Sequence, residues 1–194
     1  MAQKKTVWMT EVALMAAVLC VLAPFSIPIG EIPITLATFA VYLTAAILGS
    51  KKGTASVLIY LLIGMVGVPV FSNFTGGAAK LAGPTGGYLI GYLPCAFLVG
   101  FLVEREFKAI KNLNGMAKNA FELIYSVLAM VLGTVLCYLF GTAWFMYQMS
   151  ETYTVAQALA ICVVPYLAFD TVKIVLATAI AVPIRKLLKK NGML

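Results

Sequence analysis

Two ionisable residues, Asp170 and Lys173, lie three positions apart in the apolar stretch VVPYLAFDTVKIVLATAIAV. Residues at i and i+3 share one face of a helix, so the acid and the base are within reach of each other. A charge at the centre of a bilayer costs on the order of 3 kcal/mol even on scales from insertion experiments. The pair is either a salt bridge that locks helix packing or part of a binding site for a polar ligand. Because apolar residues often stabilise a protein more than a buried ion pair does, we interpret it as a binding site.

Further ligand groups are predicted in the glycine-rich segment 70–85 and just after it. Asn73, Thr75, Lys80 and Tyr88 supply hydrogen-bond donors and acceptors, and glycines let a backbone approach a ligand closely. Segment 25–33 is rich in proline, which predicts a stiff, non-helical loop. We expect these two segments to cover a pocket that contains the charged pair.

The composition requires a membrane to surround these groups. Of the 194 residues, 62% are hydrophobic and 11% are charged, and the mean hydropathy is +1.00. A soluble domain of this length cannot bury that much apolar surface. The sequence therefore predicts an all-α integral membrane protein in one domain, residues 1–194.

Six apolar segments are long enough to be membrane helices, and their ends alternate in charge. We place the helices near 8–24, 34–49, 54–69, 86–103, 119–141 and 157–183. Of the 14 Lys and Arg residues, 12 lie at one set of helix ends: Lys4, Lys5, Lys51, Lys52, Arg105, Lys108, Lys111, Lys118, Arg185, Lys186, Lys189 and Lys190. Since Lys and Arg favour the cytoplasmic side, six crossings with both termini in the cytoplasm satisfy this pattern. Segments 25–33 and 70–85 are then on the outer side.

Several function classes are not supported by any motif. The chain has no histidine, and its four cysteines lie far apart without metal-ligand spacing, so we expect no metal site. No P-loop, nucleophile elbow or nucleic-acid motif is present, and GPTGG lacks the lysine of a phosphate loop. We therefore expect a protein that is not an enzyme, carries no cofactor and binds no nucleic acid; any ATP hydrolysis would belong to separate subunits.

On the first predicted helix, Ala13 and Ala17 form a small-xxx-small pattern. Such a pattern lets two helices approach closely. In an alanine-rich chain, the pattern is equally compatible with internal packing and with docking of a partner helix.

Three stretches carry a resemblance to a known family. They are IPIGEIPITLATFAVYLTAAILGSKKGTASVLIYLLIGMVGVPVF, GGAAKLAGPTGGYLIGYLP and FDTVKIVLA, and together with their surroundings they extend the likeness over nearly the whole chain. The chain resembles BioY, the biotin-binding S-component of energy-coupling factor (ECF) transporters. The resemblance implies a six-helix ECF S-component fold in a prokaryotic plasma membrane and high-affinity capture of biotin from outside. It also implies three partner subunits, one transmembrane coupling protein and two ABC-type ATPases.

The resemblance also implies roles for particular residues. Asp170 and Lys173 match the D-x-x-K motif that contributes to the biotin site, and Ala13 and Ala17 match the face that docks on the coupling subunit. Some relatives place Asn before the two glycines that correspond to Gly76 and Gly77, and Arg directly after GGY.

This chain departs from that pattern at two positions, with Thr75 for the Asn and Leu89 for the Arg. Asn73 is a substitute for the missing Asn. Lys80 and Lys173 are both candidates to meet the carboxylate of biotin.

Two alternatives to biotin capture stay open at this point. An S-component or small carrier for another carboxylate-bearing vitamin would use the same buried pair. A structural membrane protein would use Asp170 and Lys173 only as a packing bridge and would bind no small molecule.

Overall fold

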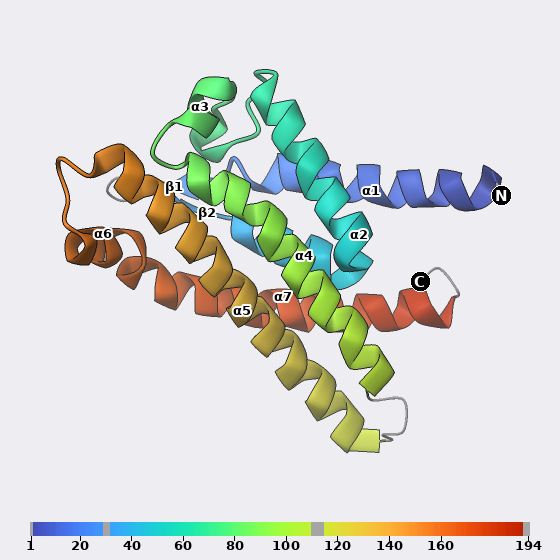
Figure 1. Ribbon diagram of the computed structural model, residues 1–194. Coiled ribbons are helices and arrows are strands. Elements are labelled where there is room, and N and C mark those ends of the chain that lie inside the picture. Colours follow the sequence, from blue (N-terminus) through green and yellow to red (C-terminus); the bar gives the residue numbers. More distant parts are fainter. Residues whose placement is uncertain (1, 29–31, 110–114, 192–194) are drawn as a thin grey trace.

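The computed structural model describes residues 2–28, 32–109 and 115–191. Within them the helices and strands are α1 (Ala2–Leu22), β1 (Ser26–Ile27), β2 (Ile34–Thr35), α2 (Ala37–Met65), η1 (Ser72–Phe74), α3 (Ala78–Ala82), α4 (Gly86–Ala109), α5 (Gly115–Met149), α6 (Val155–Cys162) and α7 (Val164–Lys190). The two short strands pair antiparallel at the outer end of α1 and α2. Figure 1 shows α4 in the middle of the bundle, between α2 and α5, with α7 crossing behind α5.

The expected six membrane helices are present, and two of them, predicted near 34–49 and 54–69, together form the element α2. Five segments are long and apolar enough to cross a membrane: Lys5–Leu22, Ala37–Met65, Gly86–Arg105, Met116–Met149 and Val155–Lys190. The second of them reverses direction at Gly49, which has φ 82° and ψ −173° inside α2. The two halves of α2 are therefore separate helices, which gives the six helices of the predicted fold.

The reversal at Gly49 is held by side chains from two other helices. Arg185 of α7 donates to the carbonyl of Ala46 (2.5 Å), which satisfies the carboxyl end of the first half. Glu104 of α4 accepts from both the backbone N–H and the hydroxyl of Ser50 (2.9 Å each), which caps the amino end of the second half. The hydropathy pattern predicts a connection at 50–53. In the structure the connection is Gly49 alone, because these two caps let both helices continue up to it.

The last predicted span is divided into α6 and α7. α6 begins with a capping box, in which Thr154 and Gln157 satisfy each other's backbone N–H groups. Its regular backbone ends at Val163, and Pro165 lies in the first turn of α7. Proline has no N–H to donate to the preceding turn, which favours a break between the two helices at this point.

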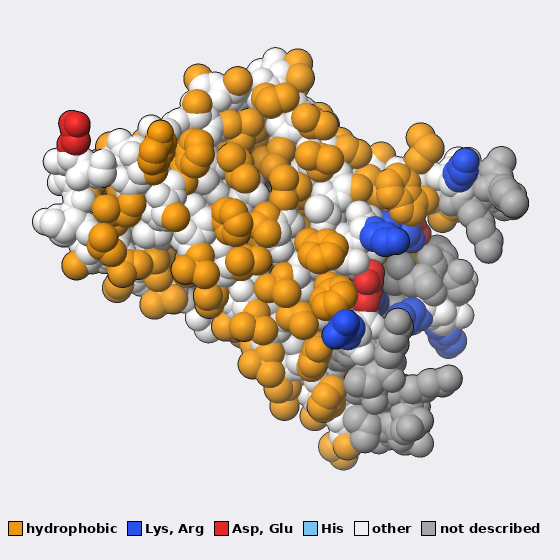
Figure 2. All heavy atoms as spheres, viewed as in Figure 1, with side chains coloured by type: hydrophobic (Ala, Val, Ile, Leu, Met, Phe, Trp, Pro, Cys, Tyr) orange, Lys and Arg blue, Asp and Glu red, His pale blue; other side chains and the backbone are white. Residues whose placement is uncertain are grey.

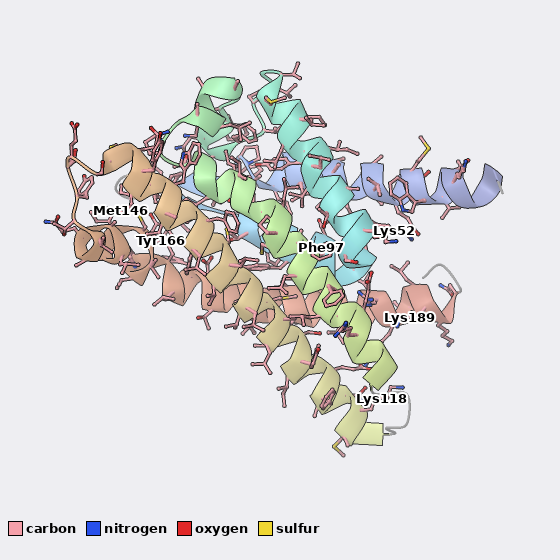
Figure 3. All side chains as sticks on the ribbon, in the orientation of Figure 1. Lys52, Phe97, Lys118, Met146, Tyr166 and Lys189 are labelled. Carbon is pink, nitrogen blue, oxygen red and sulfur yellow. The ribbon has the colours of Figure 1, made fainter. Side chains whose placement is uncertain are left out.

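Charged side chains gather at one end of the molecule. Figure 2 shows apolar side chains over most of the visible face and most of the blue Lys and Arg side chains at the end that holds both termini. Lys52, Lys118 and Lys189 lie toward this end (Figure 3). Lys111 and the side chains of Lys4 and Lys108 lie outside the described residues.

Arg185 differs from the other basic residues of the predicted cytoplasmic set. The charge pattern predicts Arg185 at the cytoplasmic end of the last helix, and in the structure its side chain is buried there against α2. Its backbone position at that end agrees with the assignment. The side chain turns inward because the broken α2 offers it an unsatisfied carbonyl.

Candidate functional site

Asp170 and Lys173 form a salt bridge inside the bundle. The Lys173 ammonium lies 2.7 Å from Asp170 Oδ1, and the two residues are only 8% and 5% exposed, respectively. They occupy one face of α7, one turn apart, as their spacing predicted. Ionised side chains buried to this extent destabilise the folded protein unless hydrogen-bonding and ion-pair partners satisfy them.

Thr38 connects the acid and the base. Its hydroxyl accepts from Lys173 Nζ (3.1 Å) and donates to Asp170 Oδ1 (3.4 Å). One hydroxyl has one proton to give and lone pairs to accept with, so both bonds can exist together. Thr38 lies in the first turn of α2, where the positive end of the helix dipole also favours the carboxylate.

Tyr138 of α5 holds the second carboxylate oxygen. Its hydroxyl donates to Asp170 Oδ2 at 2.5 Å, a short bond of the kind formed with an ionised acceptor. The three partners of Asp170 thus come from three helices: Thr38 from α2, Tyr138 from α5 and Lys173 from α7. The sequence analysis did not identify Thr38 or Tyr138.

These groups form part of the wall of a cavity at the outer end of the bundle. The walls combine several tyrosines, hydroxyl groups and apolar side chains with the charged pair: Ile32, Pro33, Thr35, Ala37, Thr38, Tyr60, Ser72, Thr85, Tyr88, Leu89, Tyr92, Tyr138, Cys162, Tyr166, Asp170 and Lys173. Mostly apolar walls with a few convergent polar groups are typical of small-molecule sites. Tyr166 on α7 lies toward the end of the molecule opposite Lys52, Lys118 and Lys189 (Figure 3).

Two of the lining tyrosines also organise the surroundings of the cavity. The hydroxyl of Tyr88 shares a hydrogen bond with that of Thr142 on α5 (3.1 Å). Tyr166 donates to the carbonyl of Ile32, which ties the loop after β1 to α7. Residues 29–31 of the predicted covering loop 25–33 lie outside the described residues, but Ile32 and Pro33 line the cavity.

The predicted residues of segment 70–85 contact the other loop more than the cavity. Asn73 accepts from the Ser26 hydroxyl, and its own N–H donates to that hydroxyl (both 2.8 Å). Thr75 donates to the carbonyl of Ser72 within its own turn (2.8 Å). In the described part of the chain, Ser72 and Thr85 line the cavity from this segment, whereas Asn73 and Thr75 do not.

Gly76, Gly77 and Lys80 are likewise outside the cavity wall formed by the described residues. A Cβ at Gly76 would lie 2.4 Å from the carbonyl oxygen of Val68, so the glycine allows two parts of the loop to touch. Gly77 has φ +98° and leads into α3, which carries the half-buried Lys80. Of the predicted ligand residues, the structure brings Asp170, Lys173 and Tyr88 together around the cavity.

Leu89, at the position where some relatives have Arg, is 7% exposed and lines the cavity from the start of α4. On α1, Ala13 and Ala17 are exposed on the outer surface, while Val12, Ala16 and Leu19 pack inward. Among the described residues, none packs closely enough on the AxxxA pattern to bury Ala13 and Ala17. Its backbone is open to a partner helix.

The comparisons with known proteins agree with this architecture. The model of the BioY family matches residues 1–190. The "Biotin transporter BioY" of Thermotoga maritima is 36% identical over 177 residues, which cover 91% of this chain and 95% of that protein. The "Biotin transporter BioY2" of Lactococcus lactis subsp. cremoris is 32% identical, with 92% of this chain and 90% of that protein covered.

A solved structure extends the comparison to three dimensions. The crystal structure of "the S-component for biotin from an ECF-type ABC transporter" superimposes with a TM-score of 0.79 at 30% identity. The match covers 96% of this chain and 94% of that one. With the family model, the relatives and the fold in agreement, the chain belongs to the BioY family.

Proposed function

We propose that this chain is the biotin-binding S-component of an ECF-type transporter and captures biotin at the outer face of a prokaryotic plasma membrane. It is a transport subunit and not an enzyme. Membership of the BioY family, relatives named as biotin transporters and the match to a biotin S-component support this function. The alternative of a carrier for another vitamin has no comparable support.

The observation that carries the proposal is the buried Asp170–Lys173 pair on the wall of a cavity at the outer end of the helices. Biotin has a ureido ring with two N–H donors and one carbonyl acceptor. An ionised carboxylate accepts such N–H groups in bonds roughly twice as strong as neutral ones. We therefore assign Asp170 to the ureido N–H groups and Lys173, which Thr38 holds in place, to the ureido oxygen.

The carboxylate tail of biotin then points toward the outer loops. Ser72 and Thr85 offer hydroxyl groups there, and Leu89 supplies apolar surface for the valeryl chain. Lys80, on α3 in the same segment 70–85, is the remaining candidate to offset the charge of the tail. Asn73, Thr75, Gly76 and Gly77 contribute by shaping the loop that covers the ligand.

Entry of biotin requires the covering loops to separate. Among the described residues, the contacts between the two loops include the hydrogen bonds of Asn73 with Ser26 and with the carbonyl of Pro24, and the edge-on contact of the Phe25 and Phe74 rings. Tyr166 bonds Ile32 to α7, while Trp144 and Gln148 of α5 donate to the carbonyls of Gly83 and Ala82. A small number of hydrogen bonds, each worth about 1 kcal/mol net, is compatible with opening and closing on the timescale of transport.

The transporter would be completed by a transmembrane coupling subunit and two ABC-type ATPases. We propose that Ala13 and Ala17 dock on the coupling subunit. Their exposure on α1, together with the close approach that small residues permit, supports this assignment.

Isothermal titration of biotin into the purified protein, freed of bound ligand, tests the function. We expect one-to-one binding, and a loss of about 10- to 100-fold in affinity for Asp170→Asn, because a bond to a charged group is worth about 1.5–3 kcal/mol. Glu151→Gln is the matched control, since Glu151 is exposed and is not among the residues that line the cavity. Nicotinate, which bears a carboxylate but no ureido ring, should give no heat.

Two results would contradict the proposal. Tighter binding of nicotinate than of biotin would assign the site to another vitamin. Unchanged biotin affinity in Asp170→Asn, or a larger loss from any single substitution in segment 70–85, would remove Asp170 from its role as the principal contact.

A further inference from the structure

A second hollow lies on the membrane face of the bundle, behind the ligand cavity. It is a groove of about 550 Å³ between α5 and the α6–α7 segment. Its apolar lining includes Val135, Leu139, Leu159 and Leu167, all of which are strongly exposed. These residues belong to segments that are long and apolar enough to cross the membrane, so hydrocarbon surrounds the groove.

The local backbone explains why the groove exists. α7 starts after the break at Val163, and Val163 itself lines the groove. In Figure 1, α6 and the start of α7 separate from α5 at this end of the molecule. The helices therefore leave a space at membrane depth that their own side chains do not fill.

The polar groups in the lining are already satisfied by the protein. Thr134 bonds to Tyr42, Thr142 bonds to Tyr88, and the Thr171 hydroxyl donates to the carbonyl of Leu167. Asp170 and Tyr138 bond to each other. No Lys or Arg occurs among the described residues that line the groove. A polar ligand or a lipid headgroup would find no free partner here, whereas an alkyl chain needs none.

Two residues line both the groove and the ligand cavity, Tyr138 and Asp170. Tyr138 and Asp170 therefore lie where the two spaces adjoin. Exposing a carboxylate to hydrocarbon is strongly unfavourable. The hydroxyl of Tyr138 lowers that cost by donating to Oδ2, and Tyr138 forms part of the wall of both spaces.

We propose that the groove between α5 and α7 binds one acyl chain of a membrane phospholipid, and that Tyr138 is a positioning residue that separates this chain from the ligand site. The occupancy of the groove is independent of the proposed function, but the effect of Tyr138 on biotin binding rests on it. Loss of the tyrosine ring joins the two spaces and lets the acyl chain compete with biotin.

Native mass spectrometry with dioleoyl phosphatidylcholine added to the detergent-purified protein tests the occupancy. Leu139→Trp fills the groove, and Leu132→Trp is its control, since both leucines lie on α5 and are exposed (63% and 51%) but only Leu139 lines the groove. We expect one retained lipid in the wild type and in Leu132→Trp, and at least tenfold weaker retention in Leu139→Trp. Equal retention in all three, or no retained lipid in the wild type, would overturn the assignment.

The role of Tyr138 has its own readout. In Tyr138→Ala, the apparent dissociation constant of biotin should rise in proportion to the concentration of added phosphatidylcholine, while Tyr138→Phe, which keeps the ring, should show no such dependence. Identical lipid dependence in the two variants would refute a separating role for the ring. If Tyr138→Ala does not fold, the lipid retention of Leu139→Trp still tests whether the groove is occupied. If the wild type does not bind biotin, the proposed function is wrong, but the test of lipid binding in the groove remains valid.

Discussion

Replacing Lys173 with Met tests whether the Asp170–Lys173 pair serves ligand binding or helix packing. The substitution leaves Asp170, which is 5% exposed, with its bonds to Thr38 and Tyr138 but without a counter-charge. Removing one partner of a buried ion pair costs about 3–5 kcal/mol. Because two neutral donors remain, we expect the lower end, about 3 kcal/mol. For a chain of this size, that corresponds to a fall of roughly 6–12 °C in the melting temperature.

The double variant Asp170→Asn/Lys173→Met removes both charges. Neutral replacement of a buried pair is often harmless to stability, so we expect the empty double variant to melt within about 3 °C of the wild type. Its affinity for biotin should nevertheless stay at the level of Asp170→Asn or below. The double variant should therefore recover the stability that Lys173→Met loses, without recovering wild-type affinity for biotin.

The cysteines provide the assay. Cys95, Cys137 and Cys162 are buried and free, so a maleimide dye that fluoresces on reaction with thiols reports unfolding of the empty protein on heating. Titration calorimetry on the same samples reports biotin binding. A double variant as unstable as Lys173→Met would refute the electrostatic reasoning. A double variant that binds biotin like the wild type would show that the pair has only a structural role.

Two further predictions concern the cap at Gly49 and the face of α1. Glu104→Gln should lower the free energy of unfolding by about 1–2 kcal/mol, because the charged cap on Ser50 becomes neutral. Thermal unfolding measures the loss, with Glu151→Gln as the control. An unchanged melting temperature would contradict the capping role of Glu104. Ala17→Phe should leave biotin binding unchanged but abolish co-purification with the coupling subunit and its ATPases, with Leu132→Phe, which is exposed on α5, as control. Equal recovery of the complex in both variants would exclude docking at Ala17.

The helices could be predicted because hydropathy and the placement of Lys and Arg are local properties of the chain. The turn at Gly49 could not be located in the same way. Lys51 and Lys52 indicated a connection on the cytoplasmic side, but its length depends on caps from Glu104 and Arg185, more than 50 positions away in sequence. Such contacts leave no periodic signal near the turn.

The charged pair was predictable for a similar reason, since an acid or a base stands out in an apolar helix. Thr38 and Tyr138 do not stand out. A threonine in a helix usually bonds to its own preceding turn, and a tyrosine in an apolar segment is equally consistent with packing. Only the arrangement of α2, α5 and α7 shows that both hydroxyls reach Asp170.

The polar contacts of α7 give a physical reason why this helix keeps its charges. At the cytoplasmic end, Arg185 bonds α7 to α2, and Lys186 pairs with Glu122 of α5 (2.5 Å). At the outer end, Lys173 bonds to Thr38 of α2, and Asp170 accepts from Tyr138 of α5.

The outer contacts face the ligand cavity, and the cytoplasmic contacts do not. If biotin takes over bonds of Asp170 and Lys173, as we propose, we expect the contacts of α7 with α2 and α5 to change at the outer end and to remain at the cytoplasmic end. Apolar residues at 170 and 173 would hold the helices together as firmly, but they would respond to no ligand.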